Sequence, residues 1–176
     1  MSQVQERGRR PSNDEAASYF AGYFDLVPDG DIAVVLREQG ACVAELLEGV
    51  PAAKHEHRYA AGKWSAKELF GHMLDTERVF AYRALRIARN DQTPLPGMDQ
   101  DVFVAGGRFD ERSWQSMLDE YRPLRASTVA LVESFDEDVL SRQGSASSND
   151  FTVRALIYFL AGHETHHVNV LKERYL

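Results

Sequence analysis

Apolar side chains recur every three or four positions along most of this chain, which is the period of an amphipathic α-helix. The clearest case is the segment KWSAKELFGHMLDTERVFAYRALR, whose apolar stripe consists of Leu69, Met73, Thr76, Phe80 and Ile87. Ser65 and Glu68 form a capping box at its start, which fixes where a helix begins. We therefore predict a helix from Ser65 to about Asn90.

The same period predicts three more long helices and a short leading one. The expected ranges are 31–50, 111–135 and 151 nearly to the end of the chain, with the short helix over 14–27. Pro123 lies inside the helix expected over 111–135 and is expected to kink it. Alternating β-branched runs with Asn-Gly turns are absent, so we expect no strands. The predicted fold is all-α: a four-helix bundle with an extra short N-terminal helix.

Two connections, over residues 91–109 and 136–149, are longer than an antiparallel pair of helices needs. A connection of this length either crosses the bundle, so that two helices run parallel, or forms a lid. Asp99 and Asp101 lie in the first connection. We expect these two carboxylates to cap the loop, with an acid/base role as the alternative.

The 176 residues are enough for one domain, which we place at residues 14–176 after a disordered tail over residues 1–13. A formal net charge of −7 argues against a surface built for nucleic acid. The sequence shows no secretory signal and no apolar run that could span a bilayer. A single cysteine, Cys42, is typical of a reducing compartment. We expect a cytoplasmic protein that binds neither nucleic acid nor membrane.

Three of the six histidines lie in the segment GHETHHV on the last predicted helix. At about 100° per residue, His167 lies about 20° and His163 about 60° from Leu160, which marks the buried stripe, whereas His166 points to the flank. His72 lies at the edge of the stripe of the helix that follows Trp64. Three imidazoles from two helices form a ligand set suited to zinc, nickel, cobalt or iron(II).

The alternative is that these histidines hydrogen-bond carbonyl or tyrosine groups in the core and bind no metal. His55 and His57 are competing candidate ligands, but their segment is polar and we expect both to be exposed. The string H-E-x-x-H also occurs in zinc proteases. Those enzymes need a third ligand downstream and a mixed α/β domain, and the sequence predicts neither.

Two carboxylates close to the predicted ligands are weak candidates for a catalytic role. Glu164 lies beside the histidines of the last helix, where it either reaches the site or stays exposed. Asp75 lies one turn from His72 and either orients that imidazole or pairs with Arg78. Arg83 falls on an apolar stripe, and we expect it to be structural and to have a carboxylate partner.

The segment RYAAGKWSAKELFGHMLDTERVFAYRALRIARNDQTPLPGMDQDVFV, followed by GHETHHV, resembles the DinB/YfiT-like superfamily, in particular its DinB-like domains. The resemblance covers about residues 30–176. It implies a metal-binding four-helix bundle whose three histidine ligands correspond to His72, His163 and His167. It also implies a divalent transition metal such as zinc, nickel or iron, and makes a homodimer a reasonable expectation.

The resemblance further implies a metal-dependent enzyme acting on a small molecule. Members of the family are described as metal-dependent hydrolases, and related branches transfer low-molecular-weight thiols onto electrophiles. Three imidazoles leave a position on a metal open, where water or a thiol is activated as a nucleophile. The expected function is therefore hydrolysis or thiol transfer. The alternative is a non-catalytic metal-binding helical bundle, which a fourth protein ligand would favour.

Overall fold

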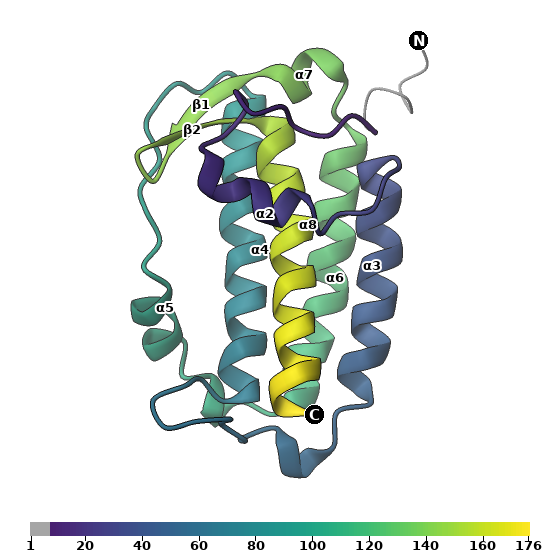
Figure 1. The fold of residues 1–176 in the computed structure, drawn as a ribbon, viewed down its shortest axis with the longest axis vertical. Coiled ribbons are helices and arrows are strands. Elements are labelled where there is room, and N and C mark those ends of the chain that lie inside the picture. The colour runs from purple at the N-terminus through teal and green to yellow at the C-terminus, as the bar shows by residue number, and fades with distance from the viewer. Residues whose placement is uncertain (1–7) are drawn as a thin grey trace.

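Four long helices form the body of the molecule in a computed structural model that describes residues 8–176 (Figure 1). They are α3 (Ile32–Glu48), α4 (Ala66–Ala88), α6 (Trp114–Glu133) and α8 (Val153–Val170). Helices α3 and α4 each pack against both α6 and α8, so α3 and α4 occupy opposite corners of the bundle. The predicted all-α four-helix bundle is confirmed. None of the described helices has the length and hydropathy needed to cross a membrane.

Shorter elements connect and cover these helices. They are the 3₁₀ turns η1 (Ser18–Phe20), η2 (Ala52–Lys54) and η3 (Phe109–Glu111), the short helices α2 (Ala21–Phe24), α5 (Gln100–Gly107) and α7 (Glu137–Ser141), the strands β1 (Gln143–Ala146) and β2 (Asn149–Thr152), and the π-helical turn η4 (Leu171–Tyr175). The predicted leading helix is therefore reduced to η1 and one turn of α2. Helix α2 lies across α8 (Figure 1).

Side chains that precede the helices determine where they begin. Asp31 accepts a hydrogen bond from the backbone N–H of Ala33 at the start of α3. Ser65 and Glu68 form the predicted capping box at the start of α4. Asp99 accepts from two backbone N–H groups at the start of α5, which confirms its capping role. Helix α6 continues through Pro123.

The segment between α4 and α6 runs along the outside of the bundle from one end to the other (Figure 1). As a result α4 and α6 run in the same direction, which is one of the two alternatives that the length of this connection left open. The segment also contains α5, which the sequence pattern did not indicate. Helix α5 packs against α4, so the connection covers one face of that helix.

A β-hairpin precedes α8, so the expectation of no strands was wrong. Strands β1 and β2 pair in antiparallel register, with Gln143 opposite Thr152. The turn is made by Ser147 and Ser148, which both have positive φ, a conformation usually supplied by Asn-Gly. The N–H of Leu95 also donates to the carbonyl of Ser145 at 2.9 Å, which ties the crossing segment to the hairpin. Helix α8 consequently begins at Val153, two residues later than the predicted start at residue 151.

Residues 8–13, which we expected to belong to a disordered tail, are held against the bundle. Arg10 donates to the carbonyl oxygen of Phe24 at 2.6 Å and to the carboxylate of Asp29 at 3.0 Å. Arg9 pairs with the buried Glu15 at 2.9 Å. The partners of Arg10 lie 14 and 19 residues further along the chain, and local patterning does not reveal such contacts. The same expectation for residues 1–7 lies outside the described part of the chain.

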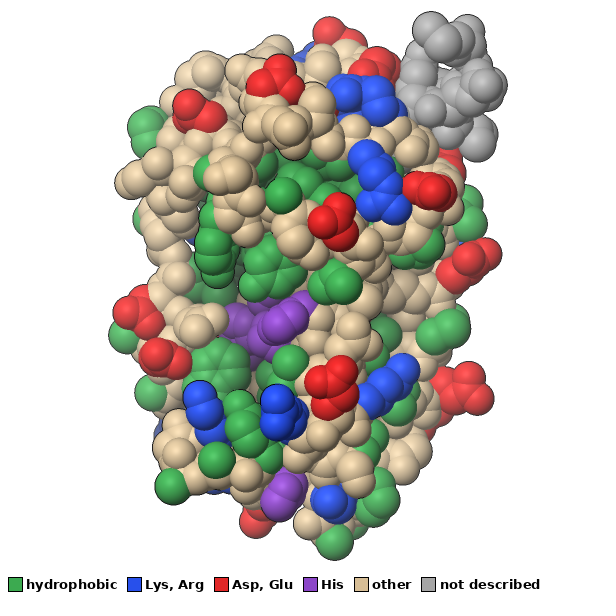
Figure 2. All heavy atoms as spheres, viewed as in Figure 1, with side chains coloured by type: hydrophobic (Ala, Val, Ile, Leu, Met, Phe, Trp, Pro, Cys, Tyr) green, Lys and Arg blue, Asp and Glu red, His purple; other side chains and the backbone are tan. Residues whose placement is uncertain are grey.

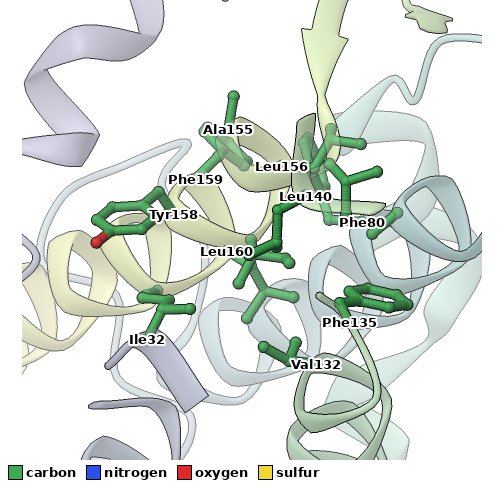
Figure 3. Close-up of a cluster of buried hydrophobic side chains, with 14 of the residues drawn as sticks. Ile32, Phe80, Val132, Phe135, Leu140, Ala155, Leu156, Tyr158, Phe159 and Leu160 are labelled. Carbon is green, nitrogen blue, oxygen red and sulfur yellow. The ribbon is translucent and has the colours of Figure 1, made fainter. Parts of the chain in front are cut away.

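Buried apolar side chains form two clusters, one in each half of the bundle. Figure 3 shows part of the first, where rings and aliphatic side chains from α4, α6 and α8 meet those of α3 and α7. Between the clusters lies a layer of buried and half-buried polar side chains, which we call the polar layer. Its members are Gln39 from α3, Glu77 from α4, Arg125 from α6 and Glu164 from α8. The candidate site lies at this level.

Candidate metal centre

Three histidines from two helices converge beside the polar layer. His72 comes from α4, and His163 and His167 lie one turn apart on α8. The Nε2 atom of His163 lies 3.1 Å from Nε2 of His72 and 3.0 Å from Nε2 of His167. All three candidate ligand atoms lie within 4.8 Å of one another. No fourth histidine, cysteine or carboxylate joins this group among residues 8–176.

The geometry of the cluster fits a metal ion. Imidazole nitrogens bound to one zinc ion at about 2.0–2.1 Å, in tetrahedral geometry, lie about 3.3 Å from each other. A neutral imidazole has one N–H donor and one acceptor nitrogen, so three Nε2 atoms that face one point cannot all satisfy each other. The Nδ1 atoms of His72 and His167 have no hydrogen-bond partner in the described structure. A shared cation would use all three Nε2 lone pairs.

Burial keeps these imidazoles uncharged. It lowers the pKa of His72 to about 4. Burial, together with the neighbouring His72 and His166, lowers the pKa of His167 to about 3. Burial and the other three histidines of this region lower the pKa of His163 well below its usual value. At neutral pH the cluster therefore presents three unprotonated nitrogens, the form that binds metal ions.

Close packing holds α2 against α8 and places aromatic rings beside the imidazoles. Gly162 precedes the first ligand of α8, and a Cβ atom at this position would lie 2.0 Å from the backbone oxygen of Tyr23. The missing side chain therefore lets the backbone of α2 lie directly on α8. The ring of Tyr23 then lies 6.0 Å from that of His163, and Trp64 lies 4.9 Å from His72.

Glu164 points into the polar layer. Its Oε1 atom accepts from the hydroxyl of Tyr121 at 2.8 Å and pairs with Arg125 at 2.9 Å. Arg125 also forms two hydrogen bonds with Glu77, at 3.0 and 2.9 Å. Burial raises the pKa of Glu164. Burial acts against the charge of Arg125, but the carboxylates of Glu164 and Glu77 outweigh it and raise the pKa of the guanidinium.

The polar layer therefore holds two carboxylates against one guanidinium, next to the histidine cluster. A cavity of about 10 Å³, lined by Glu164, Thr76 and His163 among others, separates the two groups. Glu164 Oε2 and Thr76 Oγ1 are both buried without a partner among the described residues. This volume is close to that of one water molecule, which would donate to Glu164 Oε2.

The structure places the remaining sequence candidates away from the cluster. Asp75 is half-buried; burial raises its pKa and the charge of Arg78 opposes that shift. No described residue hydrogen-bonds Nδ1 of His72, so Asp75 does not orient that imidazole here. His55 stacks on Trp114 with ring centroids 4.3 Å apart, and its exposure is intermediate rather than high.

His57 is exposed, as expected, and His166 is exposed and lies outside the cluster, as its position on the helix predicted.

Two cavities meet the histidine cluster from different sides. One, of about 400 Å³, is lined by His167 and by polar groups that include Lys63 and Asp101. The other, of about 210 Å³, is lined by His72 and His163 and mainly by aromatic residues. Gln100 at the start of α5 lines both. In Figure 2 one group of histidine side chains is visible near the middle of this face, with hydrophobic side chains above and below it.

Sequence patterns missed several groups that shape this site. Gln100 lies in a crossing segment with no periodicity, and Tyr121 and Arg125 give no sign in sequence that they meet Glu164. The expectation that Arg83 has a carboxylate partner was wrong. Nη2 of Arg83 donates instead to the carbonyl of Pro96 and to the hydroxyl of Ser147, both at 2.8 Å. The sequence signal for this group was the position of Arg83 on an apolar stripe, which indicated that the guanidinium is buried but not what it contacts.

The sequence profile of the DinB superfamily matches residues 36–171. The chain belongs to the DinB superfamily. The match includes both helices that carry the three histidines. No curated protein sequence matches the chain significantly.

Solved structures with the same fold include members with described chemistry. YfiT from Bacillus subtilis is described as a probable metal-dependent hydrolase with an unusual four-helix bundle topology. It has a TM-score of 0.72 and 14% identity, and the alignment covers 97% of this chain and 94% of YfiT. The mycothiol-dependent maleylpyruvate isomerase has a TM-score of 0.64 and 13% identity, over 78% of this chain and 58% of its own. A DinB-like protein from Bacillus subtilis has a TM-score of 0.58 and 21% identity, and the alignment covers 80% of this chain and 87% of that protein.

Proposed function

We propose that this DinB-superfamily protein is a metal-dependent enzyme in which His72, His163 and His167 hold a divalent transition metal ion such as zinc, nickel or iron. The observation that carries the proposal is the convergence of three neutral Nε2 atoms with no fourth ligand from the described chain. A metal ion bound there supplies a Lewis acid that activates water or a thiol. A non-catalytic structural ion would be expected to have a closed ligand set.

Between hydrolysis and thiol transfer, the two cavities favour thiol transfer. Hydrolysis needs one organic substrate and water, whereas thiol transfer needs two organic molecules that meet at one point. The larger cavity has polar groups, including Lys63, Asp101 and Tyr175, which suit the polar body of a low-molecular-weight thiol. The smaller, aromatic cavity suits an electrophile. The solved relative that depends on mycothiol is consistent with this choice.

The residues of the chain have distinct roles in this proposal. The three histidines bind the ion, and their low proton affinity keeps them available at neutral pH. Glu164 lines only the smallest of the three cavities and is held by Tyr121 and Arg125, so we propose that it acts on the site as a positioning residue through its helix. Asp75 lines none of the cavities described above.

The first test is the metal content of the purified protein, measured by mass spectrometry after loading with zinc, nickel or iron(II). We expect one equivalent in the wild type and in His166→Ala, and a loss of metal in His163→Ala. His166 is the matched control, because it is a histidine on the same helix that lies outside the cluster. A wild type that cannot be loaded with any of these ions contradicts the proposal.

The second test compares the two chemistries. Loaded protein is assayed for transfer of a thiol such as glutathione, mycothiol or bacillithiol to an electrophile, and separately for ester hydrolysis. Thiol transfer that is lost in His163→Ala supports the favoured chemistry. Metal-dependent hydrolysis without thiol transfer supports the alternative. A protein that binds metal and catalyses neither is a non-catalytic metal-binding bundle.

A further inference from the structure

The cavity of about 210 Å³ contains, besides the histidines, one permanent positive charge. Arg83 lines this cavity together with His72 and the rings of Phe80 and Phe159. Arg83 and His72 lie on the same helix, eleven residues apart, which is about 16 Å along the axis at about 1.5 Å per residue. The cavity therefore extends along α4 from the histidine cluster to a guanidinium group.

Arg83 differs from the other buried arginines in having no carboxylate partner. Arg125 pairs with Glu77 and Arg154 with Glu15, in each case at 3.0 Å or less. Arg83 is only 4% exposed, yet no ion pair to it occurs in the described part of the chain. A buried charge without a counter-charge is unfavourable, which accounts for the lowered pKa that burial gives Arg83.

The hydrogen bonds of Arg83 leave part of its guanidinium unused. Both of its bonds come from Nη2, to Pro96 and Ser147, and the group lies over the ring of Phe80 at 4.7 Å from the centroid. The Nε and Nη1 donors have no acceptor among residues 8–176. A guanidinium held through Nη2 on an aromatic face keeps its other N–H groups in a fixed plane, where Nε–H and Nη1–H point in different directions and each can donate one charge-assisted hydrogen bond to a carboxylate oxygen.

A second unused polar atom lies between the two ends of the cavity. Thr76, on α4 one turn after His72, lines the cavity and is 2% exposed. Its Oγ1 atom has no hydrogen-bond partner in the described structure. Buried hydroxyl groups are nearly always hydrogen-bonded, so this atom is another indication that a polar group of a ligand belongs in the cavity.

We propose that this cavity binds a small organic carboxylate with an apolar or aromatic body, whose carboxylate is held by Arg83 while its other end faces the histidine cluster. The single positive charge matches a monoanion, and the phenylalanine rings match the apolar body. A cavity of about 150 Å³ is enough for benzene, so about 210 Å³ has room for a ring and a carboxylate. The inference deepens the proposed function, because it names the class of electrophilic substrate.

The test measures binding by isothermal titration calorimetry, with phenylacetate and 3-phenylpropionate as probes and phenylacetamide as the neutral counterpart. The full chain is used in its zinc-loaded form and again after treatment with EDTA. A hydrogen bond to a charged group contributes about 1.5–3 kcal/mol, so we expect the wild type to bind at least one acid about tenfold or more tightly than the amide. Arg83→Gln should lose that preference.

Two control variants separate a direct role of Arg83 from a structural one. Arg89→Gln removes an exposed arginine at the end of the same helix and should leave binding unchanged. Ser147→Ala removes one of the two hydrogen bonds that hold Nη2, but keeps the guanidinium and its bond to Pro96, so it should weaken binding less than Arg83→Gln does. If Ser147→Ala weakens binding as much as Arg83→Gln does, Arg83 acts only by holding the hairpin and the inference is overturned.

The wild-type measurements test the inference without any variant. Equal affinity for acid and amide, or no binding of either acid, overturns it. The metal arm keeps the two proposals distinguishable. Carboxylate binding that depends on Arg83 in a protein that takes up no metal supports this inference and contradicts the proposed function. If the protein takes up metal and Arg83→Gln binds the carboxylate as tightly as the wild type, the result supports the proposed function and contradicts this inference.

Discussion

At the scale of single residues, the histidine cluster combines burial with missing hydrogen bonds. His72 illustrates the effect, because burial lowers its pKa to about 4 and its Nδ1 atom has no partner in the described structure. An exposed histidine has a pKa of about 6.5. The difference means that protons bind the unfolded chain more tightly than the folded one, so acid works against folding when no metal is present.

We therefore predict that the metal-free protein loses stability as the pH falls from 7 to 5. The unfolded chain takes up a proton on His72 in this range and the folded chain does not, so the free energy of unfolding decreases by about 2 kcal/mol from this residue alone. Urea denaturation in EDTA at both pH values measures the change. His72→Gln should reduce the decrease by about that amount, whereas His57→Gln, at an exposed position, should not. A decrease that is the same in all three proteins would contradict the prediction.

At the scale of elements, Gly162 sets how closely α2 lies on α8. A Cβ atom there would meet the backbone oxygen of Tyr23 at 2.0 Å, and a backbone atom cannot move aside alone. We predict that Gly162→Ala displaces α2 and destabilises the protein by about 1–3 kcal/mol. Thermal unfolding and hydrogen exchange of residues 18–24 measure the two effects.

Gly22, within α2, is the matched control for that prediction. A Cβ atom at Gly22 would have no neighbour within 4 Å. Replacing a helical glycine by alanine without a clash stabilises by up to about 1 kcal/mol, so Gly22→Ala should be neutral or slightly stabilising. If both substitutions have the same small effect, the contact between α2 and α8 is looser than the structure shows.

The polar layer connects all four long helices through Arg125. We predict that Arg125→Met destabilises the protein by about 3 kcal/mol or more, because it leaves Glu77 and Glu164 buried without a cation. Arg122→Met, one turn earlier on α6, removes only an exposed pair with Glu48 and should cost less than about 1 kcal/mol. Urea denaturation of both variants measures the difference. Similar costs would mean that the buried charges are neutralised by protonation.

At the scale of the whole molecule, an ion at the proposed site would join α4 and α8, two helices that lie far apart in sequence. We predict that zinc at about 100 times its Kd stabilises the folded state by about 2.7 kcal/mol and raises Tm by about 5–10 °C. Thermal unfolding with zinc chloride and with EDTA measures the shift. His163→Ala should show no shift and His166→Ala the full one, and an equal shift in both would indicate binding elsewhere.

The helices and the histidine triad were predictable because both depend on local regularities. Apolar spacing indicated four helices, Asp31 and Ser65 marked where two of them begin, and helical angles placed His163 and His167 on one face. The β-hairpin was missed because Ser147 and Ser148 adopt positive φ without the usual asparagine or glycine. The partners of Arg10, Arg83 and Glu164 were missed because they depend on contacts between segments that only the folded chain brings together.

The position of α8 in the chain has a consequence for how the protein is made. Two of the three histidines of the cluster lie on this helix, which follows the other three long helices in sequence. Helix α8 also contacts both α3 and α4, so neither half of the bundle is closed before it has been synthesised. Three of the four long helices are therefore synthesised before the ligand set is complete, so an ion at the proposed site would bind only after α8 has joined them. Under the proposed function, metal capture is then a late maturation step, and protein made without the ion would fold but lack activity.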